Sequence, residues 1–572
     1  MTEEIKPVEE NKEPTFILKN KSTYIWAVLA LGWLFDFLFW DKVPGISIAI
    51  YVTAVTVAGF LLARHQGIQP ASSIYWLLIP LVFFTAMTFI RAEPTTTFFN
   101  VLAILVILGI LARSLQGGKW WEYRFADYIK SAFLLGFESL FRQIAVFTNQ
   151  PKPASGQGKP REGLRQSLAV LRGLLIALPI VLIFAAMLAE ADPIFGNAFE
   201  DFLDIFNIEN IGEYIFRSIL ICMMAYILLG VFMHAFFKDH DADLDIEKRW
   251  LPRFLGITET IIVLGSVNLL FLAFVSIQFQ YFFGGETMIS IDGYTYSEYA
   301  RRGFGELVTV AVFSLLLFIG LSYIAKREES SHQRWFSIMG LVLFALVSVI
   351  LISSYQRLLL YESVYGFTRL RTYTHVFIWW LGALLLTVSL LEVFHRQRHL
   401  ALAALIAGMG FIASLDMINV DGFIVRQNVA RMADADFKGD EPNTERSYSE
   451  VDIGYLASLS EDVVPTLSRL YQESQSPLEK EVIAGAIACH SHVNDNYDYQ
   501  NAPYQNYTWQ SFNVSRFMAQ KDWQTRAASA DAEDFQVYYQ DDGDPDVSYW
   551  YDSYVIVNGE EIPCGGGYYG WD

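Results

Sequence analysis

Hydrophobic residues are gathered into long blocks that alternate with short polar segments between Ser22 and Asn419. A block of about 20 apolar residues forms a helix that crosses the roughly 30 Å hydrocarbon core of a bilayer. Few blocks carry a charge near their middle, as a lipid environment requires. The pattern therefore predicts about eleven membrane-spanning helices. Their approximate ranges are 22–40, 44–63, 72–91, 96–113, 166–189, 213–236, 254–283, 305–325, 335–356, 372–394 and 400–419.

The pattern changes after the last block. Residues 448–526 have helical spacing without long apolar runs, and Ser460-Glu461-Asp462 precedes an apolar run as a helix start does. Residues 535–540 and 548–557 alternate like strands, and Asn558-Gly559 is a hairpin-turn signal. The expected fold is mostly α. It is a polytopic membrane helical bundle with a C-terminal extracytoplasmic helical domain and a small β-hairpin tail.

A Pro-, Gly- and Lys-rich stretch between Thr148 and Gly163 has the composition of a linker. Residues 128–147, just before it, have apolar positions at helical spacing among charges, which favours a helix lying in the membrane interface. A short core helix is the alternative. The expected segments are a cytoplasmic tail (1–21), a four-helix membrane unit (22–113), a cytoplasmic interfacial helix and linker (114–165), a seven-helix membrane unit (166–419), an extracytoplasmic helical domain (420–526) and an acidic aromatic tail with a hairpin (527–572).

The charges of the loops predict the orientation. Residues 113–165 hold nine Lys and Arg against four Asp and Glu, whereas residues 190–213 hold seven acids and neither Lys nor Arg. Basic loops stay on the cytoplasmic side. The loops around Lys248, at 326–334 and at 395–399 are basic too, and alternation between them gives an N-terminus inside and a C-terminus outside.

The net charge of −20 is concentrated after the last apolar block, where 27 Asp and Glu stand against 9 Lys and Arg, a difference of −18 from Val420 onward. Such a segment would be repelled by the phosphates of nucleic acid. We therefore expect no nucleic-acid partner. The expected partners are membrane lipids and an envelope protein or polysaccharide.

The chain has three cysteines. Cys222 lies inside an apolar block, where cysteine packs as a small hydrophobe. Cys489 and Cys564 both fall in the C-terminal region, and a disulfide between them is permitted if that region lies outside the cytoplasm. Two unpaired thiols are the alternative.

Several strings mark the ends of apolar blocks. They are Tyr299-Ala300-Arg301-Arg302-Gly303-Phe304, Tyr365-Gly366-Phe367-Thr368-Arg369-Leu370-Arg371 and Asn419-Val420-Asp421-Gly422-Phe423-Ile424-Val425-Arg426-Gln427-Asn428. With these strings the chain resembles, over about residues 166–520, a family of bacterial multi-pass membrane proteins classed as a domain of unknown function. The resemblance implies a bacterial membrane location and supplies no activity, substrate or cofactor.

The first candidate site is a set of arginines near one predicted membrane boundary, Arg301, Arg302, Arg369, Arg371 and Arg426. Guanidinium groups bind carboxylate or phosphate in a bidentate manner. The set could hold a lipid phosphate or another anionic group. The alternative is internal pairing with acids at the same level, namely Glu190, Asp192, Glu298, Glu306 and Glu362.

A second group consists of ionisable residues in or near apolar blocks, Asp36, Glu259, His375 and Asp416. A charge in the middle of the bilayer costs at least about 2.5–3.5 kcal/mol, so such groups are paired, protonated or in contact with water. Glu259 could relay protons or bind a cation. An interhelical hydrogen bond is the structural alternative.

The acidic run Asp542-Gly543-Asp544-Pro545-Asp546 begins like a calcium loop, but Val547 stands where that loop needs Gly. We therefore expect no metal site and no cofactor. No enzyme signature is found. The leading hypothesis is a non-enzymatic envelope anchor or binding protein. The alternatives are a transporter with a polar path near Glu259 and a lipid-linked transferase acting at the outer face.

Overall fold

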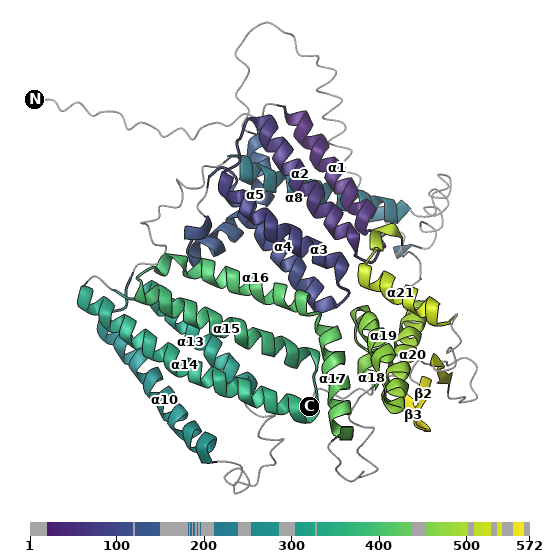
Figure 1. The fold of residues 1–572 in the computed structure, drawn as a ribbon. Coiled ribbons are helices and arrows are strands. Elements are labelled where there is room, and N and C mark those ends of the chain that lie inside the picture. Colours follow the sequence, from purple (N-terminus) through teal and green to yellow (C-terminus); the bar gives the residue numbers. More distant parts are fainter. Residues whose placement is uncertain are drawn as a thin grey trace, which may run out of the picture. The chain divides into compact units, whose positions relative to one another are not determined.

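A computed structural model describes residues 20–117, 120–148, 211–237, 253–284, 304–326, 329–437, 453–500, 508–527, 535–539 and 553–564, with isolated positions between 181 and 195. Among these residues, ten helices are long and apolar enough to span a membrane (Figure 1). The expectation of a mostly helical, multi-pass membrane protein is thereby confirmed. The helix expected at 166–189 lies mostly outside the described residues.

The chain divides into two compact units. The smaller unit contains most of α1 (Lys21–Phe39) and most of α8 (Ile211–Phe237). The two helices approach closely at Gly32, where an added Cβ would lie 2.5 Å from the carbonyl oxygen of Ile221. Glycine at this position lets the two backbones meet, as small residues do between membrane helices.

The larger unit contains a row of membrane helices in which each packs against the next. The order is α2 (Ile46–Gln66), α3 (Tyr75–Ile90), α4 (Pro94–Ser114), α16 (Leu400–Ile418), α15 (Arg369–Val393) and α14 (Ser330–Tyr365). Both α13 (Phe304–Ile324) and α10 (Ile257–Gly284) pack against α14. Figure 1 shows α14, α15 and α16 side by side.

The four-helix and seven-helix units expected at 22–113 and 166–419 stay predictions, but the described helices of the two ranges are in contact. Ile412 of α16 belongs to the same buried cluster as Ile104 and Ile107 of α4. Helices α2 to α4 therefore share a core with the later helices. The contact joins residues about three hundred positions apart, and membrane helices with apolar residues on all faces do not reveal which face is buried.

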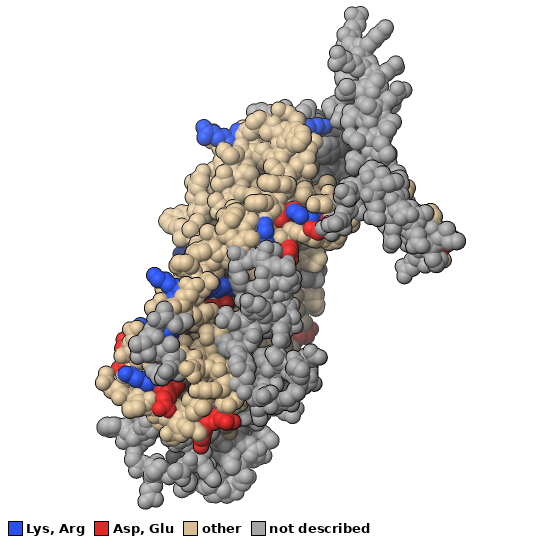
Figure 2. All heavy atoms as spheres, turned by 90° about the vertical axis from the view of Figure 1, so that its right-hand side faces the viewer, with Lys and Arg blue, Asp and Glu red and all other residues tan. Residues whose placement is uncertain are grey.

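Large apolar side chains remain exposed along the membrane helices, among them Trp76, Leu105, Leu269, Phe313 and Leu386. A soluble protein would bury such side chains, whereas lipid is the natural solvent for them. Figure 2 looks onto the side of the protein that carries the helical domain, where both basic and acidic side chains are visible among the uncharged residues.

Helix α14 has 36 residues, which corresponds to about 54 Å at 1.5 Å per residue. It extends past the apolar block expected at 335–356 and ends at Gly366, whose φ of 75° favours glycine. The last two turns of α14 therefore carry polar residues, among them Glu362 and Ser363.

Helix α5 (Phe125–Thr148) covers the segment expected to form an interfacial helix. It is not among the ten helices that the described residues offer as membrane spans. Its place in the interface stays a prediction.

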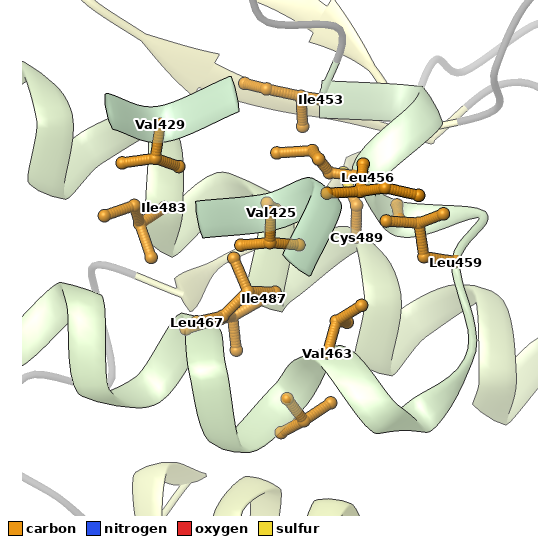
Figure 3. Packing of buried hydrophobic residues seen from close by; sticks show 14 of the residues in the cluster. Val425, Val429, Ile453, Leu456, Leu459, Val463, Leu467, Ile483, Ile487 and Cys489 are labelled. Atoms are coloured by element: carbon orange, nitrogen blue, oxygen red, sulfur yellow. The ribbon is translucent and has the colours of Figure 1, made fainter. Parts of the chain in front are cut away.

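A helical domain follows the membrane helices. Helix α17 (Val420–Phe437) begins directly after Asn419, whose φ of 55° ends α16. The domain continues with α18 (Ile453–Ala457), α19 (Val464–Glu473), α20 (Pro477–Gln500) and α21 (Val514–Ala527). Figure 3 shows its core, in which Val425, Leu456, Val463 and Ile487 lie together. Val376 of α15 and Leu415 of α16 belong to the same buried cluster, so the core of this domain is continuous with the end of the bundle.

A small antiparallel sheet follows, with the order β1 (Tyr538–Tyr539), β2 (Ser553–Val557) and β3 (Glu560–Pro563). Asn558 and Gly559 join β2 to β3 with φ values of 51° and 82°, as a type I′ hairpin turn requires. The hairpin expected from Asn558-Gly559 is thus present. Gly485 of α20 leaves room for the sheet, since an added Cβ would lie 3.1 Å from the side chain of Val555.

A disulfide joins Cys489 of α20 to Cys564 just after β3, across 75 residues of sequence. Cys222 is a free thiol. The disulfide ties the sheet to the helical domain.

We predict that the denatured chain reacts with one equivalent of a maleimide before reduction and with three after it. The reason is that only Cys222 is free while the Cys489–Cys564 bond is intact. Intact-mass measurement counts the labels, and Cys222→Ser is the control that should lower each count by one. Three labels on the unreduced chain would contradict the disulfide.

Candidate functional site

Three chain turns meet at one end of the larger unit. They are the α3–α4 turn around Ala92, the α14–α15 turn around Phe367 and the α16–α17 junction at Asn419, and all three contact the helical domain. We call this end of the bundle the docking end. The strings at 365–371 and 419–428 lie here in direct contact, although about fifty residues separate them in sequence.

The central ion pair of the docking end joins α15 to α17. Arg369 donates through Nε and Nη2 to the two carboxylate oxygens of Asp421, at 2.8 and 2.6 Å. Asp421 is fully buried. It also accepts hydrogen bonds from the backbone N–H and the hydroxyl of Ser460, at 2.8 and 2.6 Å. One carboxylate on α17 thus connects the bundle helix α15 with the segment of the helical domain around Ser460.

A second buried carboxylate, Asp462, holds the α3–α4 turn. Its Oδ2 accepts from the backbone N–H groups of Ala92 and Glu93 at 3.0 and 3.1 Å. The turn's own Glu93 caps α4 by accepting from the N–H groups of Thr95 and Thr96. Negative charge is favourable at a helix N-terminus, so both carboxylates stabilise the start of α4.

The last carbonyl groups of α3 are satisfied from the helical domain as well. Asn513 donates to the carbonyl of Arg91 at 2.8 Å. The Ser515 hydroxyl lies within hydrogen-bond distance of both the carbonyl of Ile90 and the carboxylate of Asp462, and its one proton is donated to either acceptor. Near the start of α2, an added Cβ on Gly45 would lie 2.6 Å from the carbonyl of Phe512, so the two backbones are in close contact.

Burial has the largest effect on the pKa values of two residues of the helical domain at this contact, Asp462 and Tyr455. It raises the pKa of Asp462 above its ordinary value, partly offset by the hydrogen bond from Ser515 and the charge of Arg91. Burial also raises the pKa of Tyr455 to about 12. The Tyr455 hydroxyl accepts a hydrogen bond from the backbone N–H of Arg369 at 2.9 Å, which holds the side chain in place.

The arginines expected to form one anion site have different roles in the structure. Arg369 is paired with Asp421, an acid outside the set of partners considered from sequence. Arg371 donates to the carbonyl oxygens of Tyr365 and Gly366 and stacks 4.0 Å from the ring centre of Tyr361. Arg301 and Arg302 lie outside the described residues. Arg426 is the remaining described member of the set.

Arg426 lines a cavity of about 750 Å³ at the docking end. The wall comes from the first turns of α15, the last turn of α16, the start of α17 and the end of α3. Its basic side chains are Arg91, His375 and Arg426, and its aromatic side chains are Trp379, Trp380 and Phe423. The described lining contains no carboxylate side chain, so the ionisable side chains of the wall are all basic.

His375 connects the cavity to α14. Its Nε2 lies 3.0 Å from the Tyr355 hydroxyl, and its Nδ1 lies 3.4 Å from Oε2 of Glu362. The Glu362 carboxylate is buried, and within the described residues it makes no hydrogen bond.

The other ionisable candidates are separate from one another. Asp36 pairs with Arg217 at 2.7 Å inside the smaller unit. Asp416 is buried at the end of α16 and accepts a hydrogen bond from Asn100 at 3.0 Å. Glu259 is exposed in the first turn of α10, at the helix end rather than near its middle.

The described residues contain no group of three His, Cys, Asp or Glu side chains able to hold a metal ion. The acidic run at 542–546 lies outside the described residues.

Asp421, Asp462 and Arg91 were not selected as site residues from sequence. Asp421 stands inside one of the strings that carry the family resemblance, and Asp462 stands in a helix-start signal. The string and the helix-start signal could have indicated Asp421 and Asp462 as candidates. Neither pattern identifies a partner that is distant in sequence.

A family model described as a domain of unknown function, DUF4153, matches residues 78–470. This range includes the docking end with Asp421 and Asp462. No curated protein and no solved structure matches the chain.

We predict that Asp462→Ala lowers stability by about 2 kcal/mol or more, because two buried backbone N–H groups lose their acceptor. Asp462→Asn keeps a carbonyl oxygen as acceptor and should be much milder. Thermal unfolding of the full chain in detergent measures both effects. Glu473→Ala, an exposed acid on α19, is the matched control with no expected change.

The wild-type chain and Asp462→Asn should also differ in the pH dependence of their stability. Since the pKa of Asp462 is raised in the folded state, its contribution to stability is complete below the ordinary value of 3.8 and is lost as pH rises through the raised value. The wild-type chain should therefore lose stability over that window relative to Asp462→Asn, which cannot titrate. Parallel stability curves for the two chains would contradict the assignment.

Proposed function

Because the chain belongs to the DUF4153 family, whose description carries no activity, we propose from its own geometry that it is a bacterial cytoplasmic-membrane protein that anchors and presents a C-terminal domain outside the cytoplasm. The observation that carries this proposal is the docking of the domain. Asp421 and Asp462 are buried, and their hydrogen bonds run to bundle and domain alike. The bundle thus holds the domain in a fixed pose.

The loop charges support the proposed orientation. Loops expected inside meet at the end of the bundle opposite the docking end, where Gln333 lies 3.4 Å from His395 and Arg398 lies 3.6 Å from Glu122. These contacts place the basic loops at the same end of the bundle, as expected if successive helices cross the membrane in alternating directions. Lys and Arg are enriched in cytoplasmic loops, so the docking end is proposed to face outward.

The disulfide between Cys489 and Cys564 is a second support. Disulfides persist in oxidising compartments and are rare in the cytosol. Its position in the C-terminal domain agrees with a domain outside the cytoplasm.

The presented domain is strongly acidic, with 27 acids and 9 basic residues after position 419. Such a surface attracts cations and basic groups and repels nucleic acid. An envelope protein or a polysaccharide is therefore the proposed partner class, and the membrane lipids surround the bundle.

We predict that alkaline phosphatase fused after Asp572 is active in intact cells, because this enzyme needs the compartment outside the cytoplasm. The same reporter fused after Phe237, before the loop expected inside, should be inactive. Enzyme assay with an equal-expression blot measures both fusions. An active fusion at Phe237 together with an inactive one at Asp572 would reverse the orientation and remove the proposal.

A further inference from the structure

The cavity at the docking end is lined in part by exposed side chains of the membrane helices. Two of its lining residues, Trp379 and Met417, are 64% and 72% exposed on membrane helices. Both lie within the helices long and apolar enough to span the membrane. Hydrocarbon chains from the bilayer can therefore reach the mouth of the cavity without crossing protein.

The polar end of the cavity carries positive charge. Arg426 makes no hydrogen bond and no ion pair with the described residues. The charged side chain that acts on Arg426 is another cation, Arg469. Arg91 uses Nε to donate to the backbone carbonyl of Asp416 at 2.8 Å. Two guanidinium groups thus line a cavity whose described lining holds no carboxylate side chain. The charge of Arg91 also acts on Asp462 outside the lining, whereas Arg426 has no such acidic neighbour among the described residues.

Thr372 gives an independent sign of a missing ligand. Its side chain is 2% exposed, it lines the cavity, and its hydroxyl makes no hydrogen bond within the described part of the chain. Buried hydroxyl groups in proteins nearly always have a partner. An oxygen of a bound molecule would supply it.

We propose that this cavity binds the phosphate headgroup of an anionic membrane lipid, with Arg426 and Arg91 at the phosphate and the acyl chains beside Trp379 and Met417. Guanidinium groups are suited to phosphate because their N–H groups match its oxygens. A volume of about 750 Å³ and an apolar mouth fit an amphiphile better than a free phosphate ion. This inference goes beyond the proposed function and does not depend on which side of the membrane the docking end faces.

The test measures lipid binding to the full purified chain in detergent by native mass spectrometry. Phosphatidylglycerol, phosphatidylcholine and inorganic phosphate are titrated separately. We expect one phosphatidylglycerol to bind more tightly than phosphatidylcholine, and we expect Arg426→Ala to weaken it about tenfold or more. Arg398→Ala is the matched control, since this exposed arginine lies at the opposite end of the bundle and pairs with Glu122.

A second variant keeps the test decisive if Arg426→Ala fails to fold. Thr372→Val has the same shape without the hydroxyl, and it should weaken phosphatidylglycerol binding about threefold or more. Equal binding of the two lipids, or binding unchanged in both variants, would overturn the proposal. Arg426-dependent binding of inorganic phosphate without binding of phosphatidylglycerol would assign the cavity to a soluble anion and would overturn the lipid source.

Discussion

The structure of the docking end depends on the cost of burying a carboxylate. A buried charge must be paired and hydrogen-bonded, because an isolated one is penalised by several kcal/mol. Asp421 meets this requirement with Arg369 and Ser460, and Asp462 meets it with the backbone of the α3–α4 turn. Each donor comes from a different part of the chain. The helical domain therefore cannot leave the bundle without leaving these carboxylates and their donors unpaired.

The membrane helices could be predicted from sequence because lipid imposes a local constraint. Every span needs about 20 apolar residues, and the blocks at 72–91 and 400–419 coincide closely with helices of the structure. The hairpin at Asn558-Gly559 was predictable for the same reason, since a type I′ turn requires positive φ at two adjacent residues and therefore favours Asn-Gly. The packing of α4 against α16 was not, because helices that are apolar all round give no sign of the face they bury.

The candidate site was predicted only in part. Arginines at a membrane boundary were a sound starting point, and Arg369, Arg371 and Arg426 all lie at the docking end. Their different roles depend on partners that sequence patterns do not encode. Asp421 is 52 residues from Arg369, and Asp462 is 370 residues from Ala92. The local pattern of apolar and polar residues does not indicate which distant residues pair. These pairs become visible only in the folded structure.

Helix α17 relates the docking of the domain to the cavity. Val425 and Val429 are four residues apart, so they share the face of the helix that lies in the core of the domain. Phe423 and Arg426 are three residues apart and share the face that lines the cavity. The Arg369–Asp421 pair and the bonds of Asn428 to the backbone of Phe367 set the position of both faces. A molecule held by Arg426 binds only while α17 is docked, so its binding free energy adds to the stability of the docked domain.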